Sequence, residues 1–376
     1  MPQLLDLPLQ ILEDIVAIVL DCQPRTEKTH LGLPVKTLYL FSSESPRIKK
    51  HAHRLLLSSK LLNQVTSYIL YSRSVLYFPT KKVVDRFVAT AGESTLRQIR
   101  HISIEFHEDR RSYPRPPLEP GPGANVATIT KLLSKLSSDL VSIRLLPPYY
   151  ECPYDENRLW SHPALVEQLK RFSSLQDLHL DFEPRWLNLD LISLSTYRSR
   201  APEPVVDPVP LPPMFPCLRH LHLTGCLNNE TGPEDLRLAL SQDQLPSLQV
   251  LVIDTLCSEG GKRGDPIFTP EAIAGMNPLV EFSWTWQHRS GLWEAAGSPR
   301  EHLGRSHLKA LHERHRQTLR ALHLNYIYCD DFEDVPDREE FRKYLGGFQL
   351  RRYFFHCPAK EVVMYSPYHP TTYQSA

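Results

Sequence analysis

The chain has 376 residues, and its 43 basic residues balance its 43 acidic residues, so the formal net charge is zero. This balance argues against a nucleic-acid-binding protein, which needs a basic surface, and against electrostatic docking on a membrane. Proline is abundant, with 33 residues against 15 glycines, which indicates stiff loops and helix starts.

The first predicted element is an amphipathic helix in LLDLPLQILEDIVAIVL, residues 4–20. Acidic and amide side chains interrupt the apolar run, so neither a signal peptide nor a membrane span is expected. Asp6 is placed to cap the helix, and Pro8 falls in its first turn. The predicted apolar stripe contains Leu12, Ile15, Val16 and Val19, with Ile11 and Ile18 beside it, and the polar stripe contains Gln10, Glu13, Asp14, Ala17 and Asp21. We expect an intracellular protein, cytoplasmic or nuclear.

A phrase of three large apolar residues, Φ-x-x-Φ-x-Φ, occurs seven times after residue 98. FSSLQDLHLDF, FPCLRHLHLTG and LPSLQVLVID are clear copies. The first apolar residues of the seven copies are Ile99, Leu140, Leu175, Leu218, Leu248, Leu279 and Leu319. The last two apolar residues would point inward from a strand, as in a leucine-rich repeat. Copies are 30 to 43 residues apart, longer than the roughly 20–29 residues of a regular repeat, so each unit must include a helix.

Stacked strand–helix units bury a shared core, so the phrases predict an α/β fold. The expected form is an irregular leucine-rich-repeat solenoid, with parallel strands on the concave face and helices on the convex face. Helix starts at TGPEDLRLAL (231–240), TPEAIAGM (269–276) and SPREHL (298–303) agree with it. Proline-rich loops at 112–124 and 200–216 interrupt the array. The alternative is a compact α/β domain whose strands share the phrase by chance.

The sequence offers no motif for catalysis, a metal or a cofactor, so we predict a protein that is not an enzyme. HERHRQ, with His312 and His315, lacks zinc-protease spacing and is expected on a solvated helix face. EGGKRGD, residues 259–265, lacks P-loop spacing and is expected in an exposed loop. The seven cysteines form no C-x-x-C pair, which indicates free thiols in a reducing compartment.

Histidines and aromatic residues are the candidates for partner contacts. In HLHLTG and ALHLNY, histidine alternates with leucine and should point away from the core, toward the face that a solenoid offers to partners. Such histidines are either solvated surface or part of a binding surface. Trp284 and Phe355 are expected in the core, whereas Trp286, Tyr326 and Tyr328 are candidates for the concave side.

The opening LDLPLQILEDIVAIVL resembles the start of the F-box, whose pattern is roughly L-P-x-E-I-L-x-x-I-x-x-x-L. The matching residues are Leu7, Pro8, Ile11, Leu12, Ile15 and Val19 or Leu20. LLLSSKLLNQVTSYILYSRSVLYF, residues 55–78, resembles the leucine-rich helix of the box, and the segment up to residue 104 is similar to F-box-like proteins of filamentous fungi. The chain departs from the pattern at Gln10, at Leu61 and Leu62 where an aromatic is expected, and in the long interval that contains the candidate strand VKTLYLF.

The resemblance implies an F-box-like helical domain at residues 1–80, with an insertion at about 21–50, and a leucine-rich-repeat domain at 81–376. It implies a non-catalytic substrate-recognition subunit of a cullin–RING ubiquitin ligase, which supplies proximity. A Skp-type adaptor would bind Leu7, Pro8, Ile11, Leu12 and Ile15, and the arc would bind an unknown target protein. The alternative is a leucine-rich interaction scaffold without ligase partners, whose first helix caps the solenoid. An enzyme on an α/β fold is the least favoured interpretation.

Overall fold

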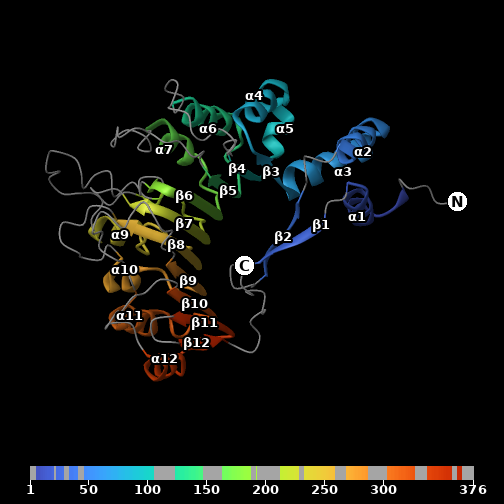
Figure 1. Ribbon diagram of the computed structural model, residues 1–376. Helices are drawn as coiled ribbons and strands as arrows, with labels where there is room; N and C mark the ends of the chain where they lie inside the picture. Colours follow the sequence, from blue (N-terminus) through green and yellow to red (C-terminus); the bar gives the residue numbers. More distant parts are fainter. Residues whose placement is uncertain are drawn as a thin grey trace, which may run out of the picture. The chain divides into compact units, whose positions relative to one another are not determined.

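The computed structural model shows an α/β protein in which strands and helices alternate along the chain (Figure 1). The backbone forms two compact units, Met1–Leu159 with Glu167–Phe172 and Trp160–Val166 with Ser173–Ala376. The predicted boundary near residue 80 stays a prediction. The structure describes residues 6–20, 23–28, 34–40, 46–105, 123–146, 163–187, 192, 212–227, 233–258, 268–286, 303–326, 337–357 and 362–365.

The first unit begins with helices and continues into a sheet of five strands in the order β1-β2-β3-β4-β5. β1 and β2 form an antiparallel pair, and β2 to β5 are parallel. Helices α4, α5 and α6 lie along one side of β3 to β5 (Figure 1). The elements are α1 (Leu9–Val19), β1 (Gln23–Lys28), β2 (Pro34–Leu40), α2 (Pro46–Ser58), α3 (Lys60–Tyr68), the π-helical turn η2 (Ile69–Arg73), β3 (Ser74–Phe78), α4 (Lys81–Thr90), α5 (Glu93–Gln98), β4 (His101–Glu105), α6 (Gly123–Lys135) and β5 (Ser142–Leu146).

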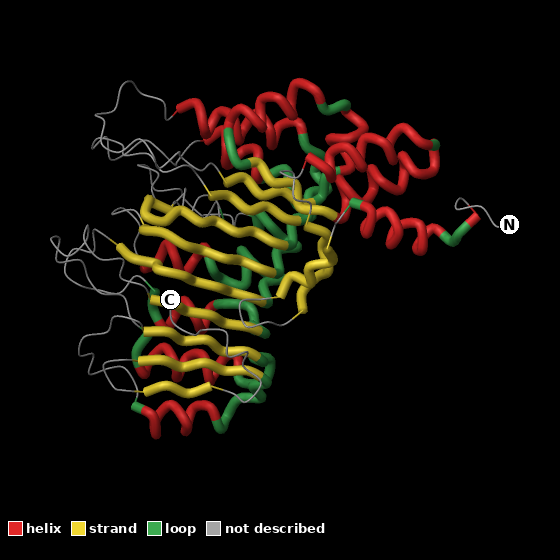
Figure 2. Tube along the Cα trace, turned by 45° about the vertical axis from the view of Figure 1, so that its right-hand side comes forward, coloured by secondary structure: helices red, strands yellow, loops and turns green. Residues whose placement is uncertain are grey.

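The second unit contains seven strands in the order β6-β7-β8-β9-β10-β11-β12. β6 to β11 are parallel, and β12 closes the edge as an antiparallel strand. Helices α9 to α12 cover one face of these strands, and Figure 2 shows the strands side by side in front of them. The elements are α7 (Pro163–Leu169, which contains the unit boundary), β6 (Asp177–Leu187), β7 (His220–Leu227), α9 (Pro233–Ala239), β8 (Val250–Ser258), α10 (Pro270–Gly275), β9 (Glu281–Trp286), α11 (Arg305–His315), β10 (Ala321–Tyr326), α12 (Arg338–Leu345), β11 (Arg352–Cys357) and β12 (Val362–Tyr365).

The apolar phrase read from the sequence forms the core of both units. All 21 of its apolar side chains, three from each of the seven copies, are at most 2% exposed. Equivalent residues align across the parallel strands, as in the row Leu221, Leu251, Phe282 and Leu322. Trp284 and Phe355 lie in this core, as predicted. The expected α/β architecture is therefore confirmed, with parallel strands and with helices on the apolar face.

A repeated backbone contact joins one copy of the phrase to the next. The carbonyl after the first apolar residue accepts hydrogen bonds from two consecutive amides of the following copy. Gln176, for example, accepts from Arg219 and His220 at 2.8 and 2.9 Å, and Gln249 accepts from Val280 and Glu281. The same contact continues past the last predicted copy, since the Arg320 carbonyl accepts from Arg351 and Arg352.

Of the five strands outside the seven predicted copies, β3 and β11 continue the same parallel register. β3 aligns Leu76 and Phe78 with the first predicted strand, and β11 aligns Tyr353 and Phe355 with the last one. Leu350 takes the first position of this additional copy and is half-buried. The pattern was missed because a tyrosine stands at the second apolar position of β11. The candidate strand VKTLYLF corresponds to β2.

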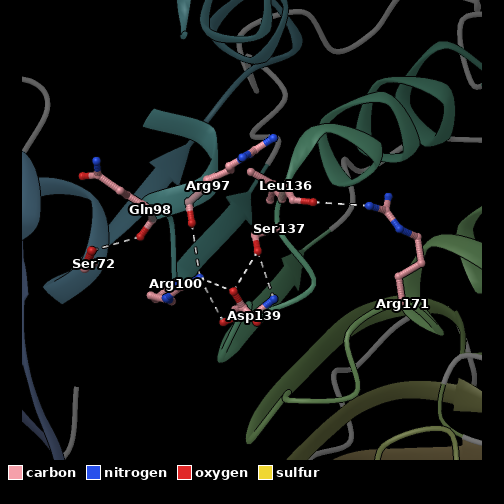
Figure 3. A network of polar contacts seen from close by, with 8 residues as sticks. All are labelled: Ser72, Arg97, Gln98, Arg100, Leu136, Ser137, Asp139 and Arg171. Atoms are coloured by element: carbon pink, nitrogen blue, oxygen red, sulfur yellow. Dashed lines mark hydrogen bonds and ion pairs between the residues drawn. The ribbon is translucent and has the colours of Figure 1, made fainter. Parts of the chain in front are cut away.

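Arginine side chains cap carbonyls where the helices of the first unit end. Arg171 Nη2 donates to the Leu136 carbonyl at 3.4 Å, beyond the end of α6, and Arg100 Nη1 donates to the Arg97 carbonyl at 3.3 Å, inside α5 (Figure 3). Arg100 also lies 3.5 Å from the Asp139 carboxylate. These contacts are largely exposed, so each stabilises the unit by less than about 1 kcal/mol. Their main effect is to satisfy carbonyls that the helices leave open.

The predicted helix starts can be compared with the structure in three places. α9 begins at Pro233 with two acids in its first turn, and Thr269 caps α10 by accepting from the Ala272 amide at 3.3 Å, both as expected. The predicted N-cap position of Asp6 is wrong, because Pro8 holds the N-cap position in an extended conformation and makes no side-chain capping hydrogen bond. SPREHL lies almost wholly outside the described residues, as do the proline-rich segment at 112–124 and most of 200–216.

Candidate interaction surfaces

One face of α1 belongs to the core of the N-terminal helices. Leu12, Val16, Ala17 and Leu20 are each at most 3% exposed, although Ala17 was expected on the polar stripe. Val16, Ala17 and Leu20 pack in a cluster whose other buried members are Ala52, Leu62, Val65, Ile69 and Leu70. Residues four apart lie on one helix face, so Leu12, Val16 and Leu20 form the centre of the buried stripe. This face holds α1 against α3.

The opposite face of α1 is also apolar, but it is exposed. Ile18 is 76% exposed, Ile11 45% and Val19 41%, while Ile15 between them is half-buried. Ile11, Ile15 and Ile18 follow an i, i+4, i+7 spacing, so they form one continuous row on the helix. Isolated exposed apolar residues are ordinary, whereas a row of them on one face is typical of a surface that binds another molecule. We call Ile11, Ile15, Ile18 and Val19 the α1 outer row.

The structure separates the five residues predicted to bind an adaptor. Pro8 and Ile11 are exposed, and Leu7 and Ile15 are half-buried. Leu12 is 1% exposed and lies in the core, so it is not on the same surface as the others. Ile18, the most exposed of the large apolar side chains described, was placed only beside the stripe. The amphipathic pattern indicated a wide apolar arc but not which part of it faces the core.

An ion pair fixes α1 to the turn that follows α3. Arg73 Nη1 lies 2.9 Å from Glu13 Oε2, and the Glu13 side chain is only 15% exposed. Glu13 was expected on the solvated stripe, but the buried arc extends to it. Because the Arg73 side chain is 43% exposed, the pair stabilises the unit by about 1 kcal/mol or less. The pair orients α1 so that its outer row faces away from α3.

The second unit presents a polar sheet face opposite its helices. The histidines that alternate with leucine lie there, as predicted, but they are not simply solvated. His220 Nδ1 pairs with the Asp177 carboxylate, and His222 Nε2 lies 2.7 Å from Asp254 Oδ2. The rings of His179 and His222 stack with centroids 3.8 Å apart. We call His179, Asp177, His220, His222 and Asp254 the histidine–aspartate cluster.

Toward β9 and β10, the same sheet face is closed to solvent. Glu281 and Ser283 are 0% exposed, and His323 is 4% exposed. The cluster, in contrast, keeps side-chain exposures of 20 to 26% for its two aspartates and for His220 and His222. The accessible part of this face is thus at β6 to β8. The candidates Trp286 and Tyr326 have side chains outside the described residues, as does Tyr328.

The prediction of a solvated helix face for HERHRQ is wrong for His315, whereas His312 is half-buried. His315 is 0% exposed, and its ring bridges the Leu279 amide and the Ile273 carbonyl. His307, in the first turn of α11, similarly accepts from the Gly304 amide and donates to the Phe268 carbonyl. Helix periodicity missed these roles because the partners are backbone groups of other segments.

Potential sites for chemistry are few in the described ranges. No group of three histidine, cysteine, aspartate or glutamate side chains there is arranged to hold a metal ion. Cys217 is an exposed free thiol. EGGKRGD, residues 259–265, lies outside the described ranges. Among the helices that are described, none is both long and apolar enough to cross a membrane.

Sequence comparison with known proteins assigns this chain to no family. No protein-family model matches it, and no curated protein is significantly similar to it. Its function must therefore be inferred from the α1 outer row and the polar sheet face.

Proposed function

We propose that this protein is a non-catalytic substrate-recognition subunit of a cullin–RING ubiquitin ligase. In this proposal, α1 and its neighbours are an F-box-like domain that binds a Skp-type adaptor. The strand–helix units are an irregular leucine-rich-repeat array whose polar sheet face binds a target protein. The chain would act in the cytoplasm or nucleus, without a cofactor, and would supply proximity and orientation.

The α1 outer row is the observation that carries this proposal. α1 packs one apolar face into the core of its unit and leaves a second apolar face exposed. Helix-in-groove recognition uses such rows of aliphatic anchors at i, i+4 and i+7. Leu12, which the resemblance places among the contacts, supports the helix from within. Pro8, Ile11 and Ile15 are the matching residues that a partner reaches, and Ile18 extends the row.

A co-purification experiment with a Skp-type adaptor tests the proposal. The test variant carries Ile11→Asp and Ile18→Asp, which place two charges in the outer row without touching the buried face. The matched control is Val83→Asp on α4, a residue with 41% exposure, similar to the 45% of Ile11. Circular dichroism and thermal unfolding of all three proteins establish that they are folded.

The expected result is a complex with the wild type and with Val83→Asp, and none with the double variant. Two buried charges at an interface cost several kcal/mol, which corresponds to a loss of roughly a thousandfold in affinity. If the folded wild type does not bind the adaptor, the ligase proposal is wrong. The alternative, an interaction scaffold without ligase partners, then accounts for the sheet face, and α1 serves only as a cap.

A further inference from the structure

Arginine side chains gather where the last two parallel strands of the second unit begin. Arg320 directly precedes β10, and Arg351 directly precedes β11. The Arg351 amide donates to the Arg320 carbonyl at 2.8 Å, so the two residues are neighbours across the ladder. Arg316 ends α11, in the turn that leads to Arg320. Arg316 and Arg351 are exposed and Arg320 is half-buried. We call these three residues the arginine patch.

The charge of the arginine patch is not neutralised by the described residues around it. The described ion pairs of α11 and α12 join other side chains, and no described carboxylate pairs with Arg316, Arg320 or Arg351. The Arg320 side chain reaches the carbonyl of Gln349, with Nη1 at 3.5 Å. This contact uses one of the five N–H donors of a guanidinium group. The patch therefore keeps most of its donors, and all of its positive charge, available to a partner.

The first unit shows how the same position is neutralised elsewhere in the array. Arg100 follows the first apolar residue of its copy, as Arg320 does. Its Nη1 donates to the Asp139 carbonyl at 3.4 Å, and it also lies 3.5 Å from the Asp139 carboxylate (Figure 3). Gln349 stands at the position equivalent to Asp139 and accepts the same kind of hydrogen bond, but its side chain has no charge. The array therefore supplies a counter-charge to Arg100 and omits it for Arg320.

The two neighbouring guanidinium groups repel each other, and an anion between them removes this repulsion. Equivalent residues of adjacent strands lie about 4.8 Å apart, and like charges placed opposite each other destabilise a sheet. A carboxylate has about four acceptor positions, so it can accept from two guanidinium groups at once. Gln317 and Gln349 beside the patch are exposed and uncharged, so they add amide donors and no competing negative charge.

We propose that the arginine patch binds an acidic segment of a partner protein through its carboxylates. A short segment matches the small number of charges in the patch. Nucleic acid is a poorer match, because it needs a broad basic surface and the chain has no net charge. The patch is separate from the histidine–aspartate cluster, which lies on β6 to β8. For its biological role alone this inference rests on the ligase proposal, in which the acidic segment would belong to the target protein.

Binding of an acidic peptide to the full chain tests the patch directly. The probe is the blocked hexapeptide Gly-Asp-Glu-Asp-Glu-Gly with a rhodamine label, and its neutral counterpart is Gly-Asn-Gln-Asn-Gln-Gly. A single-stranded thymidine oligonucleotide of the same formal charge is the third probe. Fluorescence anisotropy at low and at high salt measures each affinity. No adaptor is present, so the outcome is independent of the co-purification experiment.

Matched variants make the test specific. Arg320→Gln combined with Arg351→Gln removes two charges of the patch. The control combines Arg342→Gln with Lys343→Gln, which removes two charges from exposed side chains of α12 in the same unit. Arg351→Gln alone keeps the test valid if the double variant does not fold, since the contact of Arg351 with Arg320 is made by its backbone. Circular dichroism establishes which variants are folded.

The acidic peptide is expected to bind saturably and to bind more weakly at high salt, whereas the neutral peptide does not bind. Exposed ion pairs are individually weak, so the double patch variant should lose roughly tenfold in affinity and Arg351→Gln severalfold, while the control variant binds like the wild type. The inference is overturned if the acidic peptide does not bind, if the neutral peptide binds as well, or if patch and control variants bind equally. Tighter binding of the oligonucleotide than of the acidic peptide would overturn it in favour of a nucleic-acid partner.

Discussion

Acidification should destabilise the second unit through the buried ring of His315. Its Nδ1 accepts a hydrogen bond from the Leu279 amide at 3.0 Å, and its Nε2 donates to the Ile273 carbonyl at 3.2 Å. Only a neutral ring can make both bonds, because a protonated Nδ1 can no longer accept a hydrogen bond from the Leu279 amide. Burial of the ring lowers the pKa of His315 from 6.5 to about 4, and the neighbouring Arg314 charge acts in the same direction.

The direction of the effect follows from proton binding. Since the folded pKa lies below the unfolded pKa, the unfolded chain takes up the proton first as the pH falls. The stabilising contribution is complete above about pH 6.5 and is lost between pH 6.5 and about 4. These two values correspond to a loss of about 2 kcal/mol between pH 7.5 and pH 5, and about 3 kcal/mol in full. His315 is fully buried, so solvent does not screen the effect.

Urea unfolding of the wild type and of His315→Gln at pH 7.5 and pH 5 measures this contribution. Glutamine offers an acceptor and a donor to the same two backbone groups but does not titrate in this range. The wild type should therefore lose about 2 kcal/mol more than the variant on acidification. His53→Gln, a change of an exposed histidine on α2, should keep the wild-type pH dependence. Equal losses in the wild type and His315→Gln would refute the reasoning.

Two further predictions concern packing. Gly347→Ala should destabilise the protein by about 1–3 kcal/mol, because its new methyl group would lie 1.9 Å from the His312 ring, whereas Gly346→Ala meets nothing closer than 3.7 Å and should be nearly neutral. Thermal unfolding of the pair checks this difference, and equal midpoints would contradict it. Leu12→Asp should unfold the N-terminal helical cluster, whereas Ile18→Asp should leave its circular dichroism unchanged, since the two residues are 1% and 76% exposed. Helix loss in both variants would show that the outer row also belongs to the core.

The core could be predicted from the sequence because burial repeats in a simple local pattern. Each Φ-x-x-Φ-x-Φ phrase places two side chains on the same face of a strand and a third in the turn before it. Such a pattern depends on near neighbours alone, so Leu218, Leu221 and Leu223 could be assigned without knowledge of the fold. The order and parallel direction of the strands then followed from stacking similar units.

The histidines could not be assigned in the same way. His315 is stabilised by backbone groups that lie 36 and 42 residues away along the chain. His222 similarly depends on Asp254, which is 32 residues away on the next strand. A single sequence contains no signal for such contacts, because polar periodicity on a helix or strand looks the same whether water or a distant partner satisfies the ring. The histidine–aspartate cluster therefore required three-dimensional coordinates.

For the first helix, the local sequence pattern predicts which residues are apolar, and tertiary packing decides which of them remain exposed to a partner. Its apolar residues span much of the helix circumference, which local periodicity reports correctly. The core cluster with α3 covers the arc of Val16, Ala17 and Leu20, Leu12 is buried beside it, and the pair between Glu13 and Arg73 fixes that orientation. Ile18 on the other arc contributes little to the packing of the unit, because its side chain is 76% exposed. A second aliphatic face that the fold does not use is best explained by a partner that covers it, and this is why the charge-insertion test is directed at that face and not at Leu12.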